Sequence, residues 1–287
     1  MIGIIFALMV AVFWSFGELS YSKMSKSYDR TNIYMYTYLV RTVIYLSVVL
    51  IFNSSLFGTF NINILSTMLP IIFCDLFASL VINVAVYNGK LSVVSPIMAA
   101  YPVLDIFLGM LLLNEKVSII EIVIVLIISI SIILLSINQK KTKNAPHPIK
   151  GIIFSIIYMI LVAFSTYFEK NIYINDYNVY DLYYYKGIIY FITSLFFASV
   201  ILMTPTKMKR PNFQIIRGCG LTPIGNVLYS FALSFGSMII VSPISSLYSV
   251  MTNFWSRIFL KEKISILEKI CIYLIIILTI VLIIIKI

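Results

Sequence analysis

Five ionisable side chains inside the long apolar runs of this 287-residue sequence are candidates for chemistry. They comprise three acids and two bases, namely Glu18, Arg41, Asp75, Asp105 and Lys186. A charged side chain at the centre of a lipid bilayer costs about 2.5–3.5 kcal/mol on insertion scales, so such a residue indicates a functional site. Burial favours the neutral form of a carboxyl group, which can then release its proton when a cation arrives. These residues predict a site that binds a solute and exchanges protons.

The strongest candidate among the acids is Glu18. Trp14 lies four residues earlier, so the aromatic ring and the carboxyl share one face of a helix. Gly17 lets another backbone or a ligand approach this helix closely. A carboxylate beside an aromatic ring suits a cationic or amine-bearing solute, which also gains from cation–π attraction. We therefore predict that Glu18 is the main coupling acid and the main contact of the cation.

The other four ionisable residues leave structural alternatives open. Asp75 and Asp105 have either a role in solute binding and coupling, or a role in an internal ion pair or a hydrogen bond between helices. For Arg41 and Lys186 we expect side chains that reach a helix end or pair with an acid. At the places that correspond to the three acids, the second half of the chain carries Thr166, Thr222 and Thr252. Threonine does not titrate near neutral pH, so we expect the first-half acids to carry the coupling.

Aromatic and amide side chains on the same segments are candidates for contact with the solute. They are Trp14, Asn83, Tyr87, Tyr101, Asn226, Tyr229 and Tyr248. Tyrosine and tryptophan rings can stack on flat solutes or hold cations, and the amides can donate hydrogen bonds within a cavity or between helices. Aromatic residues also form belts at the membrane surface. To such a belt we assign Tyr34, Tyr36, Tyr180 and the run from Tyr183 to Tyr185.

The sequence offers little for catalysis or metal binding. Its only histidine is His147, and it has no His-Glu-x-x-His motif, no serine–histidine pair and no nucleotide-binding motif. The three cysteines lie in apolar runs and imply no disulfide. We therefore expect no metal and no cofactor, and an intramembrane enzyme is the least favoured class. The net charge of +10 comes from basic residues in short connectors, a pattern that orients a membrane protein and does not indicate nucleic-acid binding.

The composition indicates an integral membrane protein. Apolar and aromatic residues make up 61% of the chain and charged residues 11%, against roughly 25% charged residues in soluble domains. The mean hydropathy is +1.03. Strands of a membrane barrel would alternate in short segments, so we expect an all-α protein. The first segment lacks a basic leader region and a cleavage site, and we expect it to be a retained helix. At about 20 residues per crossing, the apolar runs predict ten transmembrane helices, near 2–22, 32–52, 66–88, 92–113, 118–138, 150–170, 181–203, 213–235, 238–260 and 265–286.

The two halves of the chain repeat one another. Gly89–Tyr101 aligns without a gap with Gly236–Tyr248, and Glu115–Ile119 aligns in the same register with Glu262–Ile266. An odd number of helices in each repeat inverts the second copy in the membrane, an arrangement that many secondary transporters use for alternating access. We therefore predict a first five-helix repeat, a basic connecting loop and a second, inverted five-helix repeat, at 1–138, 139–150 and 151–287.

Prolines, glutamates and glycines predict where several helices bend, end or become irregular. Pro96 and Pro243 occupy corresponding places in the fourth and ninth helices, where each interrupts a backbone hydrogen bond and can form a kink or gate. Glu115 and Glu262 lie at corresponding helix exits, where we expect them to cap and anchor helices. We also expect an irregular eighth helix, because it contains Gly218, Gly220, Pro223 and Gly225.

The fifth and tenth helices are apolar around their whole circumference. Such helices face lipid or a protein partner, which fits either a monomer or a homodimer. Helices one, three, four, six, eight and nine should then surround the path of the solute.

These residues resemble the drug/metabolite transporter superfamily, specifically its ten-helix EamA-type members. The resemblance rests on the mid-helix proline and the terminal glutamate of Val93-Val-Ser-Pro96, Tyr101-Pro-Val103 and Leu113-Asn-Glu-Lys-Val-Ser118. The second half repeats this pattern with Ser249 in place of Pro102. It implies a secondary active transporter of the plasma membrane that exports a small organic metabolite, amino acid or drug by alternating access. A fainter likeness links Glu18 and Lys26 to small multidrug relatives that exchange protons for cationic substrates. A passive channel or facilitator remains the alternative.

The connectors predict an orientation in the membrane. Loops after odd-numbered helices hold most of the loop lysines and arginines, whereas the even-numbered loops hold only Lys116 and Lys170. Because basic loops stay in the cytoplasm, this count places both termini outside. The family resemblance implies both termini inside.

Overall fold

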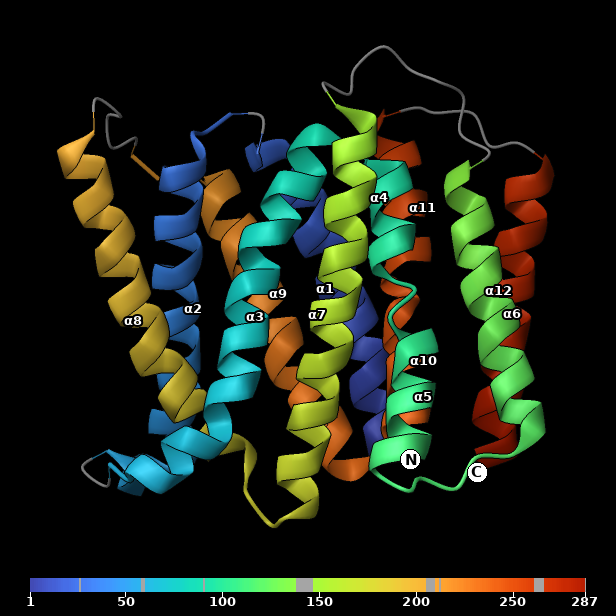
Figure 1. The fold of residues 1–287 in the computed structure, drawn as a ribbon. Helices are drawn as coiled ribbons and strands as arrows, with labels where there is room; N and C mark the ends of the chain where they lie inside the picture. The colour runs from blue at the N-terminus through green and yellow to red at the C-terminus, as the bar shows by residue number, and fades with distance from the viewer. Residues whose placement is uncertain are drawn as a thin grey trace.

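The computed structural model describes residues 1–25, 27–57, 60–89, 91–137, 147–204, 210–211, 213–260 and 266–286. Within these residues all regular structure is helical (Figure 1). The first half contains α1 (Ile2–Ser25), α2 (Arg30–Phe52), the 3-10 helix η1 (Ser54–Leu56), α3 (Ile62–Asn88), α4 (Leu91–Met98), α5 (Pro102–Leu112) and α6 (Ile119–Ile137). The second half contains α7 (Pro148–Ile174), α8 (Val179–Met203), α9 (Phe213–Phe235), α10 (Met238–Ser246), α11 (Tyr248–Leu260) and α12 (Ile266–Lys286).

The predicted fourth and ninth helices are each broken into two. Residues 99–101 separate α4 from α5, and Leu247 separates α10 from α11. Pro96 lies inside α4 and Pro243 inside α10, so both breaks follow a proline by a few residues. A proline removes one backbone donor, and its ring crowds the carbonyl four residues earlier. The broken helices therefore coincide with the motif that the two halves share.

The two halves of the fold are inverted relative to one another. In Figure 1, α1 begins on the side of the molecule that carries both labelled chain ends, and α7 begins on the opposite side. The packing repeats accordingly: α1 packs against α9 as α7 packs against α3, while α2 packs against its counterpart α8 and α6 against its counterpart α12. The predicted all-α architecture of two inverted repeats is confirmed. Most of the predicted connecting loop, namely residues 139–146 of 139–150, lies outside the described residues.

The first helix of each repeat meets the other repeat at a pair of glycines. A Cβ atom on Gly3 of α1 would lie 3.3 Å from the Cα of Gly236, and one on Gly151 of α7 would lie 2.6 Å from the Cα of Gly89. The members of the two pairs correspond in the repeat alignment. Glycine lets two backbones approach closely, so these pairs fix how α1 and α7 cross the opposite repeat.

The predicted irregularity of the eighth helix was wrong, because α9 runs without a break through Pro223. Its glycines serve packing against α1 instead. A Cβ on Gly225 would lie 2.4 Å from Cδ1 of Trp14, and the backbone of Gly218 faces the backbone of Ser20 and Tyr21.

Two charged side chains cap the ends of helices to which they do not themselves belong. The carboxylate of Glu115 accepts hydrogen bonds from the first two backbone N–H groups of α10, at 3.1 and 3.4 Å. The ammonium group of Lys170 donates to the carbonyls of Leu233 and Gly236 at the end of α9, at 2.9 and 2.8 Å. Each charge complements the dipole of the helix end that it contacts. The capping role predicted for Glu115 is confirmed, whereas Glu262 lies outside the described residues.

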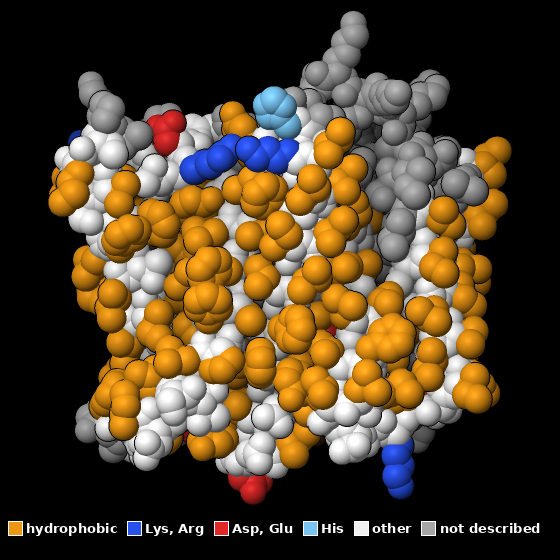
Figure 2. All heavy atoms as spheres, viewed as in Figure 1, with side chains coloured by type: hydrophobic (Ala, Val, Ile, Leu, Met, Phe, Trp, Pro, Cys, Tyr) orange, Lys and Arg blue, Asp and Glu red, His pale blue; other side chains and the backbone are white. Residues whose placement is uncertain are grey.

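The exterior of the bundle matches a lipid environment. Figure 2 shows hydrophobic side chains over most of the visible lateral surface, with charged side chains near its upper and lower edges. The peripheral pair α6 and α12 exposes isoleucines such as Ile130 and Ile277. By length and composition, six stretches of the described residues are able to cross a membrane: Ile2–Tyr21, Arg30–Phe52, Ile62–Asn88, Val94–Leu112, Ile149–Ile174 and Val179–Met203.

Candidate functional site

A cavity lies between the two repeats and is lined by side chains from α1, α2, α3, α7, α8, α9 and α11. Its charged lining residues are Glu18, Arg41, Asp75, Glu169 and Lys186. The predicted path was wrong in one respect. Among the described residues α4 and α5 supply no lining side chain, whereas α2 and α8 do. The sequence predicted that Arg41 of α2 and Lys186 of α8 reach a helix end or pair with an acid, and both side chains line this cavity.

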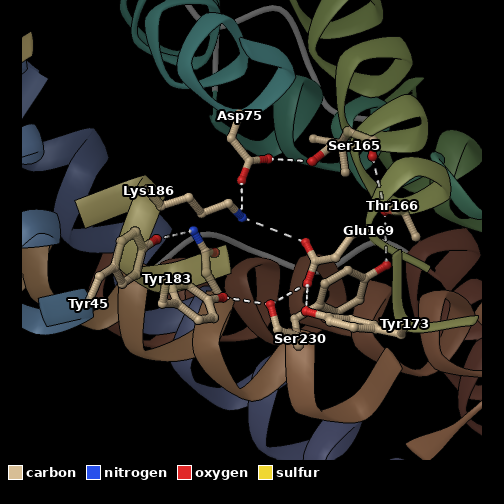
Figure 3. A network of polar contacts seen from close by, with 12 residues as sticks. Tyr45, Asp75, Ser165, Thr166, Glu169, Tyr173, Tyr183, Lys186 and Ser230 are labelled. Carbon is tan, nitrogen blue, oxygen red and sulfur yellow. Dashed lines mark hydrogen bonds and ion pairs between the residues drawn. The ribbon is translucent and has the colours of Figure 1, made fainter. Parts of the chain in front are cut away.

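Lys186 lies between two carboxylates in this cavity (Figure 3). Its Nζ atom is 2.6 Å from Oδ2 of Asp75 and 3.7 Å from Oε2 of Glu169. The hydroxyl of Ser165 donates to Oδ1 of Asp75 at 2.6 Å. The Lys186 side chain is 2% exposed, so its charge depends on these partners. The expectation that Lys186 pairs with an acid is confirmed, and Asp75 is that acid.

Glu169 is a cavity residue that the sequence analysis missed. Its Oε1 atom accepts hydrogen bonds from Tyr173, at 2.9 Å, and from Ser230. The hydroxyl of Ser230 lies 2.6 Å from that of Tyr183, which also lines the cavity. The assignment of Tyr183 to an interfacial belt was therefore wrong, because its ring is buried at the wall of the cavity.

A sequence signal for Glu169 was present. Ser165 and Thr166 lie four and three residues before Glu169, about one turn of α7, and all three line the cavity. The adjacent Lys170, near the end of the predicted run, suggested a charged interface instead. We expected the buried acids to lie only in the first half of the chain, and this was wrong, because the second half contains the buried acid Glu169.

Glu18 occupies a different part of the cavity wall. The hydroxyl of Ser95, on α4, donates to its Oε2 atom at 2.6 Å. Its Oε1 atom is buried and has no hydrogen-bond partner in the described part of the chain. Ser95 also lies 3.5 Å from the hydroxyl of Ser249, on α11. The carboxyl of Glu18 therefore lies where the broken helices of both repeats meet α1.

Four further predicted residues form one wall of the cavity near Glu18. The indole of Trp14 donates to the amide oxygen of Asn226 at 2.9 Å, and the amide nitrogen of Asn226 donates to Tyr45 at 3.0 Å. The rings of Tyr229 and Tyr248 lie 5.1 and 5.6 Å from the ring of Trp14, centroid to centroid. The structure thus brings Trp14, Asn226, Tyr229 and Tyr248 together with Glu18.

Two predicted residues of α3 do not line the cavity. Tyr87 is 42% exposed at the surface, where the guanidinium of Arg30 lies 4.6 Å from the centroid of its ring. Asn83 is buried behind the cavity wall and donates to the hydroxyl of Tyr21 at 3.4 Å. Asn83 therefore acts on the cavity only through Tyr21.

Tyr101, just before α5, and Asp105, in the first turn of α5, lie outside the cavity. The hydroxyl of Tyr101 donates to the backbone carbonyl of Ser242 at 3.3 Å. Asp105 is fully buried close to Ser242, and neither of its carboxylate oxygens has a hydrogen-bond partner among the described residues. A role for these two residues in solute contact stays a prediction.

The expectation for Arg41 was wrong. Arg41 lies in the middle of α2, is 7% exposed, and lines the cavity. It forms no ion pair within the described residues, and its guanidinium lies 5.8 Å from the centroid of the Tyr190 ring. Snorkelling was not possible because the helix continues for about three turns on either side of it.

Comparisons with known proteins agree with this architecture. The sequence profile of the EamA-like transporter family matches residues 1–137 and, a second time, residues 149–285. No curated protein matches the chain. Among solved structures, one described only as "Crystal structure of protein" superimposes with a TM-score of 0.73 over 96% of this chain and 94% of its own, at 11% sequence identity. At that identity the likeness shows the fold alone. Because the family profile covers both repeats, the chain belongs to the EamA-like transporter family of the drug/metabolite transporter superfamily, and it is a multi-pass membrane transporter.

Proposed function

We propose that this protein is a secondary active transporter of the plasma membrane that exports a small organic solute in exchange for protons. The observation that carries the proposal is Glu18, a buried carboxyl with one oxygen held by Ser95 and the other without a partner among the described residues. A neutral carboxylic acid can occupy such a place at low cost, and a carboxylate can occupy it when a cation lies beside it. The site is thus suited to hold either a proton or a cationic group.

The position of Glu18 connects this exchange to the fold. Its partner Ser95 belongs to α4 of the first repeat and lies within 3.5 Å of Ser249 in α11 of the second. A change in the charge of Glu18 therefore acts at the junction of both broken helices. Alternating access moves one repeat against the other around the binding site, so a titrating group at this junction can couple proton release to that movement.

The aromatic wall supports the same assignment. Trp14 and Glu18 lie one turn apart on α1 and both face the cavity, as predicted. A cationic or amine-bearing group at Glu18 would lie beside the rings of Trp14 and Tyr248, where cation–π attraction adds to the ion pair. The proton of Glu18 would leave as this group binds.

The test is solute accumulation in proteoliposomes with and without an imposed pH gradient. A defined mixture of amines, amino acids and organic acids is present at equal concentration on both sides of the membrane, and mass spectrometry measures which solutes become concentrated inside the vesicles. The wild type should concentrate one or more solutes in response to the gradient, and Glu18→Gln should lose this response while still folding, since a neutral amide keeps the shape of the side chain. Asp29→Asn is the matched control, because it makes the same change at an exposed acid outside the cavity.

The outcome separates this proposal from the alternatives. Concentration of solute by Glu18→Gln at the wild-type level would refute the role of Glu18. Flux in the wild type that only equalises concentrations, whatever the pH gradient, would indicate a passive channel.

A further inference from the structure

Arg41 is a buried cation in the cavity that lacks an anion. The guanidinium group has five N–H donors, yet it donates no hydrogen bond and forms no ion pair within the described residues, and its Nε atom is buried without a partner. The groups close to it are the hydroxyls of Tyr21, Tyr38, Tyr45 and Tyr190, which are neutral. The other base of the cavity, Lys186, has two carboxylates.

The difference between the two bases has a physical consequence. A buried cation that lacks a counter-charge is strongly unfavourable, and a guanidinium is retained at such a place where a planar anion pairs with its fork of donors. Because Arg41 lines the cavity, that anion can come from the cavity itself. If water is excluded from the cavity, the local dielectric constant falls, and the electrostatic stabilisation that an anion gives to Arg41 becomes larger.

The surroundings of Arg41 are suited to an anionic group. Thr37 lies one turn before Arg41 on α2 and lines the same cavity. The hydroxyl of Tyr21 accepts a hydrogen bond from Asn83 and lines the same cavity, where a hydroxyl can donate to an anion. A carboxylate has two oxygens, of which one can accept from the guanidinium and the other from a hydroxyl.

We propose that Arg41 binds an anionic group of the transported solute. Combined with the proposed function, on which this step rests, the assignment makes the solute a zwitterion, with its anionic group at Arg41 and its cationic group at Glu18. Glu18 and Arg41 line one and the same cavity, so a single small molecule inside it can contact both. Lys186 takes no part in this binding, because Asp75 and Glu169 already neutralise it.

The experiment measures binding without transport. Trp255→Phe leaves Trp14 as the single tryptophan, in the cavity wall, and keeps an aromatic ring beside Phe16. The full-length protein in lipid nanodiscs is titrated with leucine, 3-methylbutylamine and 4-methylpentanoate, which share an apolar skeleton and differ in charge. Chloride and inorganic phosphate are separate titrants, and methanesulfonate, which has no carboxylate, holds the ionic strength constant.

Leucine and 4-methylpentanoate should change the Trp14 fluorescence saturably. Arg41→Gln should raise the dissociation constants of both at least tenfold and leave that of 3-methylbutylamine unchanged. Arg41→Lys, which keeps the charge and removes the fork of donors, should give a smaller rise. Arg30→Gln is the matched control, since it removes an exposed arginine from the start of the same helix.

Three results would overturn the assignment: no saturable change with either carboxylate in the wild-type cavity, equal affinities in the wild type and the folded Arg41 variants, or binding of chloride or phosphate at least as tight as that of the carboxylates. The last result would make Arg41 a site for a free inorganic anion. If binding depends on Arg41 while transport ignores the pH gradient, only the coupling proposal fails.

Discussion

At the scale of single residues, the cavity contains three carboxyl groups and two cations in unequal pairings. Lys186 holds Asp75 and Glu169 together, and these residues come from α8, α3 and α7. Glu18 and Arg41 each lack a charged partner among the described residues. The paired cluster is therefore suited to holding helices together, and the unpaired groups are suited to ligands.

Lys186→Met should destabilise the protein strongly. The change leaves the buried carboxylate of Glu169 and the partly exposed carboxylate of Asp75 without a cation, and loss of one partner from a buried pair typically costs about 3–5 kcal/mol. Thermal unfolding in detergent measures the effect, and adding Asp75→Asn should recover part of it because one of the two stranded charges is removed. The exposed Lys150→Met serves as control. An unchanged unfolding temperature in Lys186→Met would show that the cluster does not stabilise the fold.

The sequence predicted part of this site. Glu18 and Lys186 stand out because ionisable residues within apolar runs need a physical reason. Glu169 was not predicted, because a lysine follows it near the end of a predicted apolar run, where charged residues are common. Which of two bases finds an acid depends on how the helices pack, so the unpaired state of Arg41 could be seen only in three dimensions.

At the scale of helices, close backbone contacts position the cavity. Gly151 of α7 meets Gly89 at the junction of α3 and α4, and Gly3 makes the corresponding contact in the other half. Because α7 carries Glu169 and α1 carries Glu18, these crossings set the places of both carboxyls.

Gly151→Ala should therefore lower stability. Its Cβ would lie 2.6 Å from Cα and 2.7 Å from N of Gly89, which are backbone atoms that cannot rotate away. Overpacking of this kind costs about 1–3 kcal/mol, which a thermal unfolding scan will detect. At Gly220 the nearest atom to an added Cβ is 3.9 Å away, so Gly220→Ala should be neutral or stabilise by about 0.5–1 kcal/mol through its higher helix propensity. Equal losses in the two variants would contradict the role of the glycine contact.

Hydropathy located most helices because each crossing needs a long apolar run, and the repeated Val-Ser-Pro motif marked both broken helices. The sequence-based prediction failed for α9, where the glycines and Pro223 suggested an irregular helix. Their neighbours in α1 decide the outcome there, since glycine serves close packing against Trp14 and the backbone tolerates Pro223. The contribution of α2 and α8 to the cavity wall was missed for a related reason, because their charges were considered without the helices opposite them.

At the scale of the whole molecule, the inverted repeat gives the scaffold two-fold symmetry, and the charges break it. The repeat predicted the inversion because five crossings reverse the direction of the second copy. The basic residues predict that both termini face outside. A reporter that fluoresces only in the cytoplasm, fused in turn to each terminus, should stay dark at both ends and become bright in the loop at 139–150. A bright reporter at either terminus would reverse this orientation.

The most direct test of the account counts protons as solute leaves. Proteoliposomes are loaded with the exported solute and a pH-sensitive dye, and the membrane potential is clamped with potassium and valinomycin. If Glu18 exchanges its proton for the cationic group, efflux of solute down its gradient should acidify the interior of wild-type vesicles, and Glu18→Gln should abolish the acidification. Acidification by Glu18→Gln equal to that of the wild type would contradict the central claim that Glu18 carries the proton.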